Sequence, residues 1–310
     1  FNPAKARVWR RSNQKIYGTY ERLFDLQTHG WSNVQASHVN LPLGHSHEAG
    51  AMINAAALLT PYLPALAASS PLVEGEFGPA VDNRLHWIVS HQARVPESTG
   101  TMVPEYIEDL ADYKRKILRP MYAAISRLAN ATAIRREFLN ARAAVVKFSR
   151  NALEVRVLDV QECVKMDIAI AAYVRAALQG LSIRIRNGKL ALPPHDELVA
   201  DFHAVIMSGG SASVQAPHLG PVRDPGQPID AREALGYLLE IARDQVRKSD
   251  AHYMDEIEAL IERGSLSERI RQTLLPYVDD EREFIEASRR LYIRLADCLI
   301  ENTPWDGALD

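Results

Sequence analysis

Two residues of opposite charge, Glu154 and Arg156, stand two positions apart in a mostly apolar stretch, 151–159. Leucine and valine residues alternate there with Glu154, Arg156 and Leu158, and this period of two predicts a strand with one apolar and one mostly polar face. A strand rises about 3.3 Å per residue, so the two charged side chains project the same way, about 6.6 Å apart. Such a carboxylate can hold Mg²⁺, and such a guanidinium can grip a carboxylate or phosphate through two hydrogen bonds. The alternative is an exposed strand face with an ion pair worth about 0–1 kcal/mol.

A histidine and an asparagine occupy one face of another alternating stretch, 31–42, which also predicts a strand. His38 and Asn40 share that face with Ala36, while Val39 and Leu41 belong to the other. A neutral imidazole beside an amide could contact a phosphate or a metal, although a strand histidine more often has a structural role.

Three arginines could add positive charge to the same site. Arg84 follows Asp82 and Asn83 at an expected helix start after a glycine-containing loop, and backbone N–H groups at a helix start attract anions. The alternative there is a plain N-cap with a solvated arginine. Arg142 and Arg150 bracket the strand that precedes Glu154, where they could neutralise a polyphosphate or simply be solvated strand ends.

Other motifs carry no chemistry that the spacing supports. The two histidines in GHSHE at 44–48 are two apart in an expected loop, and His86 and His91 are five apart on an expected helix, whereas a shared zinc face on a helix requires four. The sequence contains no phosphate-binding GxxxxGK[ST] loop, no GxGxxG after a strand and no GxSxG elbow. Cys163 lies on an apolar helix and is expected to be buried and inert.

The elements that would position these residues are a few strands among many helices. Helices are expected over 15–26, 48–59, 61–68, 82–94, 109–128, 133–139 and 162–181, and strands over 31–42, 143–148 and 151–159. Residues 69–79 and 95–108 are expected to be irregular, and 208–228 to form a connector. Amphipathic helices follow over 195–207, 230–246, 251–263, 266–275 and 280–300. Strands and helices do not alternate, so the fold class is α+β with a helix-rich second half.

Composition narrows the class of protein. The chain has 310 residues, of which 47% are hydrophobic and 24% charged, with a net charge of −3. Nucleic-acid and membrane-surface roles need a concentrated basic face, which this balance disfavours. Two cysteines predict a reducing, cytoplasmic location. The sequence has no run of 18 apolar residues, the length that would predict a membrane span. The chain opens on Phe1 rather than methionine, and we expect it to be part of a longer protein.

Five short motifs, taken in order, resemble glutamate–cysteine ligase family 2, a family of carboxylate–amine ligases related in fold to glutamine synthetase. They are QASHVN at 35–40, LPALAASSPLVEG at 63–75, DNR at 82–84, NAR at 140–142 and LEVRVLD at 153–159. The resemblance covers roughly residues 14–180. It implies an ATP- and Mg²⁺-dependent enzyme that phosphorylates the γ-carboxylate of glutamate and then lets the amine of cysteine attack the acyl phosphate, the first step toward glutathione.

The resemblance also implies an architecture. The sheet would be an antiparallel, glutamine synthetase-like funnel with packed helices, and its polar face would carry the metals. Residues 1–194 would be the remaining part of the catalytic sheet with its helices, and 195–310 the helical C-terminal part of the same domain.

The roles of individual residues follow from the same resemblance. Glu154 would be a Mg²⁺ ligand, and Arg156 and Arg84 would be catalytic, holding transferring phosphate or substrate. His38 and Asn40 would sit against the metal–phosphate cluster. The weaker candidates for the ATP phosphates are Arg142 and Arg150.

The sequence departs from the family at its start. The family has an acidic Glu-x-Glu strand near its N-terminus, and Glu74 and Glu76 have that spacing but lie in a different motif. Three functions stay open: a glutamate–cysteine ligase, a related ligase with another acceptor amine, and a non-catalytic member that binds nucleotide or a partner chain. The expected partners are small molecules, and a homo-oligomer stays open.

Overall fold

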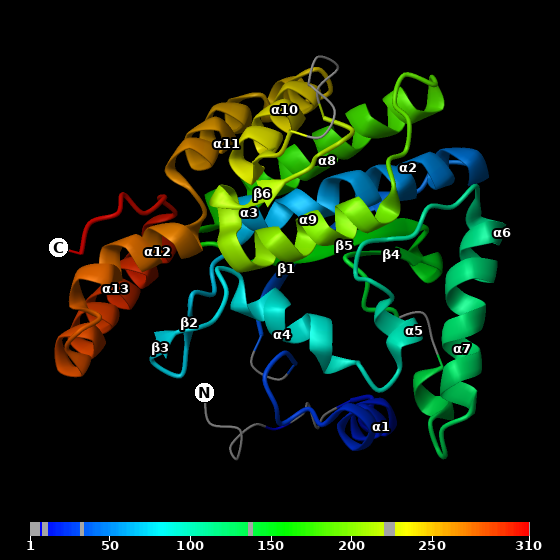
Figure 1. The fold of residues 1–310 in the computed structure, drawn as a ribbon, viewed down its shortest axis with the longest axis horizontal. Coiled ribbons are helices and arrows are strands. Elements are labelled where there is room, and N and C mark those ends of the chain that lie inside the picture. The colour runs from blue at the N-terminus through cyan, green and yellow to red at the C-terminus, as the bar shows by residue number, and fades with distance from the viewer. Residues whose placement is uncertain (1–6, 8–11, 32–33, 136–138, 220–226, 310) are drawn as a thin grey trace.

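The computed structural model describes residues 7, 12–31, 34–135, 139–219 and 227–309 (Figure 1). Its largest sheet among these residues has three antiparallel strands in the order β1-β5-β4. The strands are β1 (Ala36–Pro42), β4 (Ala144–Lys147) and β5 (Ala152–Asp159). The alternation in 151–159 therefore forms the central strand of that sheet, as its period of two indicates.

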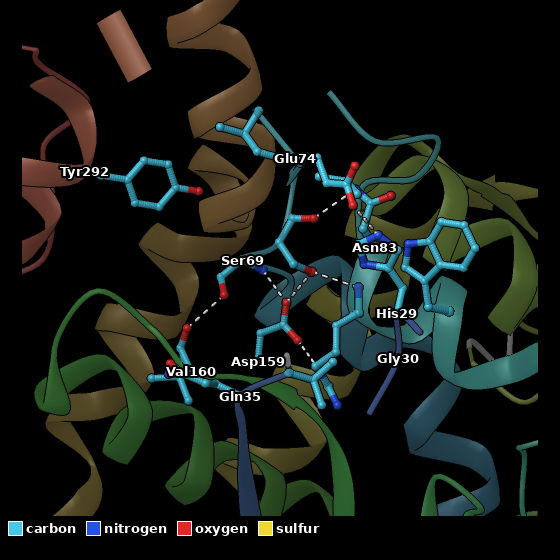
Figure 2. A pocket seen from close by; sticks show the side chains of 15 residues that line it. His29, Gly30, Gln35, Ser69, Glu74, Asn83, Asp159, Val160 and Tyr292 are labelled. Atoms are coloured by element: carbon cyan, nitrogen blue, oxygen red, sulfur yellow. Dashed lines mark hydrogen bonds and ion pairs between the residues drawn. The ribbon is translucent and has the colours of Figure 1, made fainter. Parts of the chain in front are cut away.

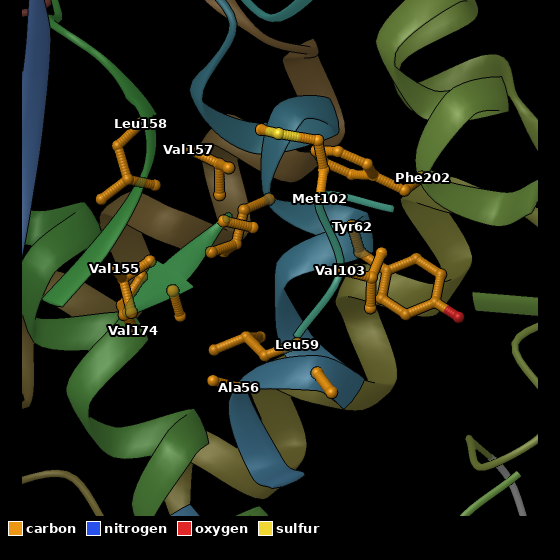
Figure 3. Close-up of a cluster of buried hydrophobic side chains, with 14 of the residues drawn as sticks. Ala56, Leu59, Tyr62, Met102, Val103, Val155, Val157, Leu158, Val174 and Phe202 are labelled. Atoms are coloured by element: carbon orange, nitrogen blue, oxygen red, sulfur yellow. The ribbon is translucent and has the colours of Figure 1, made fainter. Parts of the chain in front are cut away.

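One face of the sheet is packed against helices and forms the core (Figure 3). The helices are α2 (Ser46–Leu59), α3 (Leu63–Ala67) and α8 (Val164–Arg186), with the 3-10 turn Thr60–Tyr62 between the first two. Val155 of β5 meets Val174 of α8 in this cluster, and both are fully buried. Alanines along α2 let it lie close to α8, because a small side chain keeps the two backbones near each other.

The other face of the sheet looks toward α1 (Gln14–Phe24), α4 (Asn83–His91) and α5 (Pro96–Thr99), which lie below it in Figure 1. A short hairpin of β2 (Leu72–Val73) and β3 (Glu76–Phe77) precedes α4. Beyond α5, the segments α6 (Leu110–Tyr113), the π-helical Lys114–Leu118 and α7 (Arg119–Ser126) follow one another as a nearly continuous helical rod.

The second half of the chain is helical. Its helices are α9 (His195–Ser208), α10 (Ala231–Arg243), α11 (His252–Arg263), α12 (Leu266–Leu274) and α13 (Glu281–Glu301). The bridges β6 (Ser213–Val214) and β7 (Ile229–Asp230) pair between α9 and α10. The main core cluster contains residues from α9, α10 and α11 together with the sheet, whereas α12 and α13 form a smaller cluster around Trp305.

Several element boundaries differ from expectation. The strand expected over 31–42 begins only at Ala36, and the stretch 69–79 contains the β2–β3 hairpin rather than irregular chain. In the helix expected over 133–139, the described part is a 3-10 turn at Thr132–Ile134, while 136–138 lie outside the described residues. The segment 95–108, expected to be irregular, holds α5.

The α+β class is confirmed by this mixture of a small antiparallel sheet and many helices. Three strands do not enclose a funnel, so the glutamine synthetase-like funnel stays a prediction.

Two helical stretches of the described chain are long and apolar enough to cross a membrane by length and composition alone. Glu48–Ala67 is 94% buried within the protein, and Val164–Arg186 is 56% buried. Both contribute to the core cluster, and interior helices commonly have this composition.

Candidate functional site at the polar face of the sheet

A β-bulge decides which side chains of β5 reach the polar face. Val39 pairs with Val155, but Ser37 pairs with Leu158, so β5 holds one extra residue opposite His38. Side chains alternate between the two faces along a strand, so the extra residue exchanges the two faces for the part of β5 beyond the bulge. Asp159 therefore joins the face of Glu154. The placement of Leu158 on the polar face was wrong: it is buried in the core.

Glu154 lies among three basic side chains on that face. Its Oε1 is 3.2 Å from Lys147 Nζ on β4, 3.3 Å from Arg156 Nε and 3.6 Å from His38 Nδ1 on β1. Asn40 is its cross-strand partner. The Glu154 side chain is only 7% exposed, so the alternative of an exposed strand face with a weak ion pair does not apply.

The imidazole of His38 is partly buried beside Arg156. Burial, and then the positive charge of Arg156, lower the pKa of His38 below its usual range, although Glu154 opposes them. Arg156 itself is held in place because its Nη1 donates to the Asn140 carbonyl at 2.8 Å. A neutral ring can accept or donate one hydrogen bond without adding charge to the cluster.

Arg84 reaches the same region from the start of α4. Asp82 is the N-cap of this helix, as expected, and accepts from Leu85 N–H at 2.8 Å. Arg84 is buried and its Nε donates to Asp159, which also accepts from Ser69 N–H at 2.8 Å. Arg84 Nη2 is buried and has no hydrogen-bond partner among the described residues. One donor of a paired arginine is therefore left for a ligand.

A cavity of about 350 Å³ is lined by several of these basic side chains, whereas Lys147 and Glu154 are not among its lining residues. Its wall includes His38, Arg84, Arg142 and Arg156, and no carboxylate of the described chain lines it. Apolar side chains such as Ile88 form the rest of the wall. Positive charge in a partly apolar enclosure suits an anion, because charges interact more strongly away from bulk water.

Arg142 and Arg150 are placed differently from the other arginines. Arg142 is buried and donates from Nε and Nη2 to the two carboxylate oxygens of Glu105, each at 2.6 Å, and from Nη1 to Asn140 and to the Glu97 carbonyl. It lines the cavity, yet its hydrogen-bonding capacity is largely used within the protein. Arg150 lies exposed in the turn between β4 and β5 and is not part of the cavity wall.

Mg²⁺ is a poor match for the described residues alone. Among them, no three His, Cys, Asp or Glu side chains come together as a metal site. Glu154 is one carboxylate facing Lys147, Arg156 and His38. Mg²⁺ is commonly held by one or two carboxylates plus phosphate oxygens, so Glu154 could serve only as part of such a site.

Two residues of this face were not identified from the sequence. Lys147 could have been found, because the alternation of its strand places it on the face opposite to Val146, which is the face of Glu154. No pattern in the sequence indicates Asp159, because it lies an odd number of positions after Glu154 and regular alternation would place it on the opposite face.

Asp82 gives a prediction for stability against pH. Burial, with the neighbouring Asp159 carboxylate, raises the pKa of Asp82 from 3.8 to about 8. Between these values the folded protein holds a proton that the unfolded chain has lost, so the free energy of unfolding should fall as pH rises from about 4 to about 8, by at most ~1.4 kcal/mol per pH unit. Asp82→Asn cannot ionise and should show a smaller decline. Urea unfolding at pH 5 and pH 8 compares them, and equal declines would contradict the assignment.

Comparison with known proteins identifies the family of this chain. The family model described as glutamate-cysteine ligase family 2 matches residues 2–292. An uncharacterized protein of Archaeoglobus fulgidus is 33% identical over 265 residues, which cover 86% of this chain and 65% of the relative. The chain thus spans less than two thirds of that relative's length. Because the family model matches nearly the whole chain, the protein belongs to glutamate-cysteine ligase family 2.

Proposed function

We propose that the protein is an ATP-dependent ligase that joins the γ-carboxylate of glutamate to the amine of cysteine, which makes the precursor of glutathione. Membership of the family supports a ligase of this kind or a related one. The observation that carries the proposal is the cavity at the polar face, which Arg84, Arg156 and His38 line without a carboxylate in the described wall.

Transfer of a phosphoryl group from ATP to a carboxylate requires a cavity lined by positive charge. The γ-phosphoryl group of ATP would pass to the carboxylate oxygen as ADP leaves, and the amine nitrogen would then displace phosphate from the acyl carbon. Phosphoryl transfer requires little covalent work from the protein and depends on positioned positive charge. Arg156 would contact the transferring phosphate. Arg84 would hold the substrate or the acyl phosphate through its Nη2, which has no hydrogen-bond partner among the described residues.

A smaller cavity next to the first suits the adenine base. It has a volume of about 280 Å³ and shares Trp31 and Arg156 with the first cavity. Tyr17 also lines it and meets Trp31 edge-to-face, with ring centroids 5.9 Å apart. Aromatic rings stack favourably on bases, so we place the base here and the phosphates toward Arg156.

Mg²⁺ belongs to the proposal as the partner of ATP, with Glu154 as one ligand and Asn40 beside it. The ion would supply positive charge to the phosphates when bound. Glu154 would have to exchange its contacts with Lys147 and Arg156 for the ion, and the remaining ligands would be phosphate oxygens, water or residues beyond those described. Arg142 and Arg150 remain weaker candidates for the ATP phosphates.

We also propose that the protein acts on small molecules in the cytoplasm and uses neither nucleic acid nor a membrane. Cys163 and Cys298 are both buried and free, which fits a reducing compartment. Oligomeric state stays open.

A coupled assay of ADP release tests the function. Release that requires glutamate and cysteine together supports the proposed ligase, and release with glutamate and a different amine assigns the related ligase. Binding of Mg–ATP without turnover under any pairing would identify a non-catalytic member and overturn the proposal.

A further inference from the structure

A second and larger cavity adjoins the cationic one. It measures about 540 Å³, and the two cavities share Gly30, Val34 and Arg84 in their walls. Arg84 thus stands at the boundary between two enclosures. The second cavity lies against the β2–β3 hairpin and the end of β5, and α13 contributes Tyr292 on its opposite side (Figure 2).

The two cavities differ in charge. Two carboxylates, Glu74 and Asp159, line the second cavity, whereas the described wall of the first has none. Asp159 is already engaged, because it accepts from Arg84, Ser69 and Ser70. Glu74 is half exposed, and its carboxylate lies 3.0 Å from His29 Nε2. Glu74 is therefore the acidic group of this cavity that can turn to a positively charged ligand.

Local geometry fixes Glu74 at the cavity. It occupies the tip of the β2–β3 hairpin together with Gly75, with φ values of 55° and 96°. Two residues with positive φ in a two-residue loop form the tight turn that matches the twist of paired strands. His29 is itself stacked on Trp87 of α4, with ring centroids 5.2 Å apart.

Aromatic side chains add a second feature. Trp87 and Tyr292 both line the cavity, and Figure 2 shows the Tyr292 ring pointing into it from the side opposite His29. The Trp87 Nε1–H is buried without a hydrogen-bond partner within the part of the chain that the structure describes. A carboxylate beside aromatic rings attracts an ammonium group, through charge and through the ring faces.

We propose that this second cavity binds the acceptor amine as an ammonium ion paired with Glu74, while the cationic cavity holds the carboxylate that is activated. The ammonium passes one proton to the Glu74 carboxylate, and its nitrogen then attacks the acyl carbon as phosphate leaves and takes up the second proton. This assignment rests on the proposed ligase function. The volume of the second cavity suits a ligand of amino-acid size. Arg84 lines both cavities, so the amine and the activated carboxylate would lie on either side of one guanidinium.

Glu74→Gln tests the assignment through the choice of nucleophile. The KM for the acceptor amine should rise about 10-fold or more, since a hydrogen bond to a charged group is worth about 1.5–3 kcal/mol and 1.4 kcal/mol is tenfold. The KM values for glutamate and ATP should stay unchanged. Hydroxylamine is small and mostly uncharged at neutral pH, so the rate of γ-glutamyl hydroxamate formation should not change either. Glu76→Gln is the matched control, because Glu76 is exposed on the same hairpin outside the cavity wall.

The outcomes separate the two proposals. An unchanged KM for the amine in Glu74→Gln, a raised KM for glutamate, or an equal loss with hydroxylamine and amine would overturn the amine site while the ligase function stands. If the unmodified protein forms neither amide nor hydroxamate from glutamate and ATP, the ligase function fails and the amine site fails with it.

Discussion

Replacing Arg84 by lysine should lower the rate of amide formation by about 10²–10³-fold, the usual cost of removing one positioned donor to developing charge. The three nitrogens of the guanidinium have different partners. Nε donates to Asp159, Nη1 lies 3.4 Å from the Arg156 carbonyl oxygen, and Nη2 has no partner among the described residues and would contact the ligand. Lysine keeps the charge beside Asp159 but has a single ammonium group, which cannot reproduce this planar fork. Steady-state rates of ADP release at saturating substrates measure the effect.

Lysine is chosen because alanine would confuse folding with catalysis. Arg84→Ala would leave Asp159 buried without its counter-charge, which costs about 3–5 kcal/mol when a buried pair is broken. Arg175→Lys is the matched control: Arg175 pairs with Asp250 at 3.2 Å and lies outside the three cavities of the site. If Arg84→Lys retains full turnover while Arg175→Lys does too, Arg84 does not contact the reacting groups.

Glu154→Gln should reduce turnover by about 10²-fold or more while the protein remains folded. The substitution keeps the shape of the side chain but removes the one negative charge that lies between Lys147, Arg156 and His38. These basic groups would then lose the carboxylate with which they pair, and Mg²⁺ would lose its proposed ligand. Lys147 and Arg156 lose a buried counter-charge in this variant, so the melting temperature should fall, and turnover is compared at a temperature at which both proteins are folded.

Two readouts locate the cause. Turnover in Glu48→Gln should stay near that of the unmodified protein, because Glu48 pairs with Arg186 at a partly exposed site away from the polar face. Affinity for ATP, measured by calorimetry with and without Mg²⁺, shows whether Glu154 acts through the ion. An unaltered rate in Glu154→Gln would remove Glu154 from the site, and an equal affinity change with and without Mg²⁺ would remove it from the metal.

Much of the local structure could be predicted from the sequence. The alternation around Glu154 gave the central strand, Asp82 gave the start of α4, and the apolar pattern gave most helices of the second half. The missed β2–β3 hairpin has strands of two residues each, too short for any period to stand out. The helix expected over 109–128 is present but contains a π-helical segment at Lys114–Leu118, which no residue spacing indicated.

The residues that surround the charged groups could not be predicted in the same way. Arg142 and Glu105 are 37 positions apart, and Arg84 and Asp159 are 75 apart. No pattern in the sequence links such pairs, and the same arginine can be a ligand-binding residue or a structural one according to its partner. The second cavity depends likewise on α4, α13 and the hairpin meeting in space.

By itself, then, the sequence determined the class of fold, the alternating strand and the residue types of its polar face, because strand period and helix capping are set by residues a few positions apart. Tertiary structure alone decided that Asp159 shares the face of Glu154, that Lys147 neutralises it, and that Glu105 occupies Arg142. The physical reason is that strand register, a one-residue bulge and helix packing determine which charges meet, and each of these depends on contacts between distant parts of the chain.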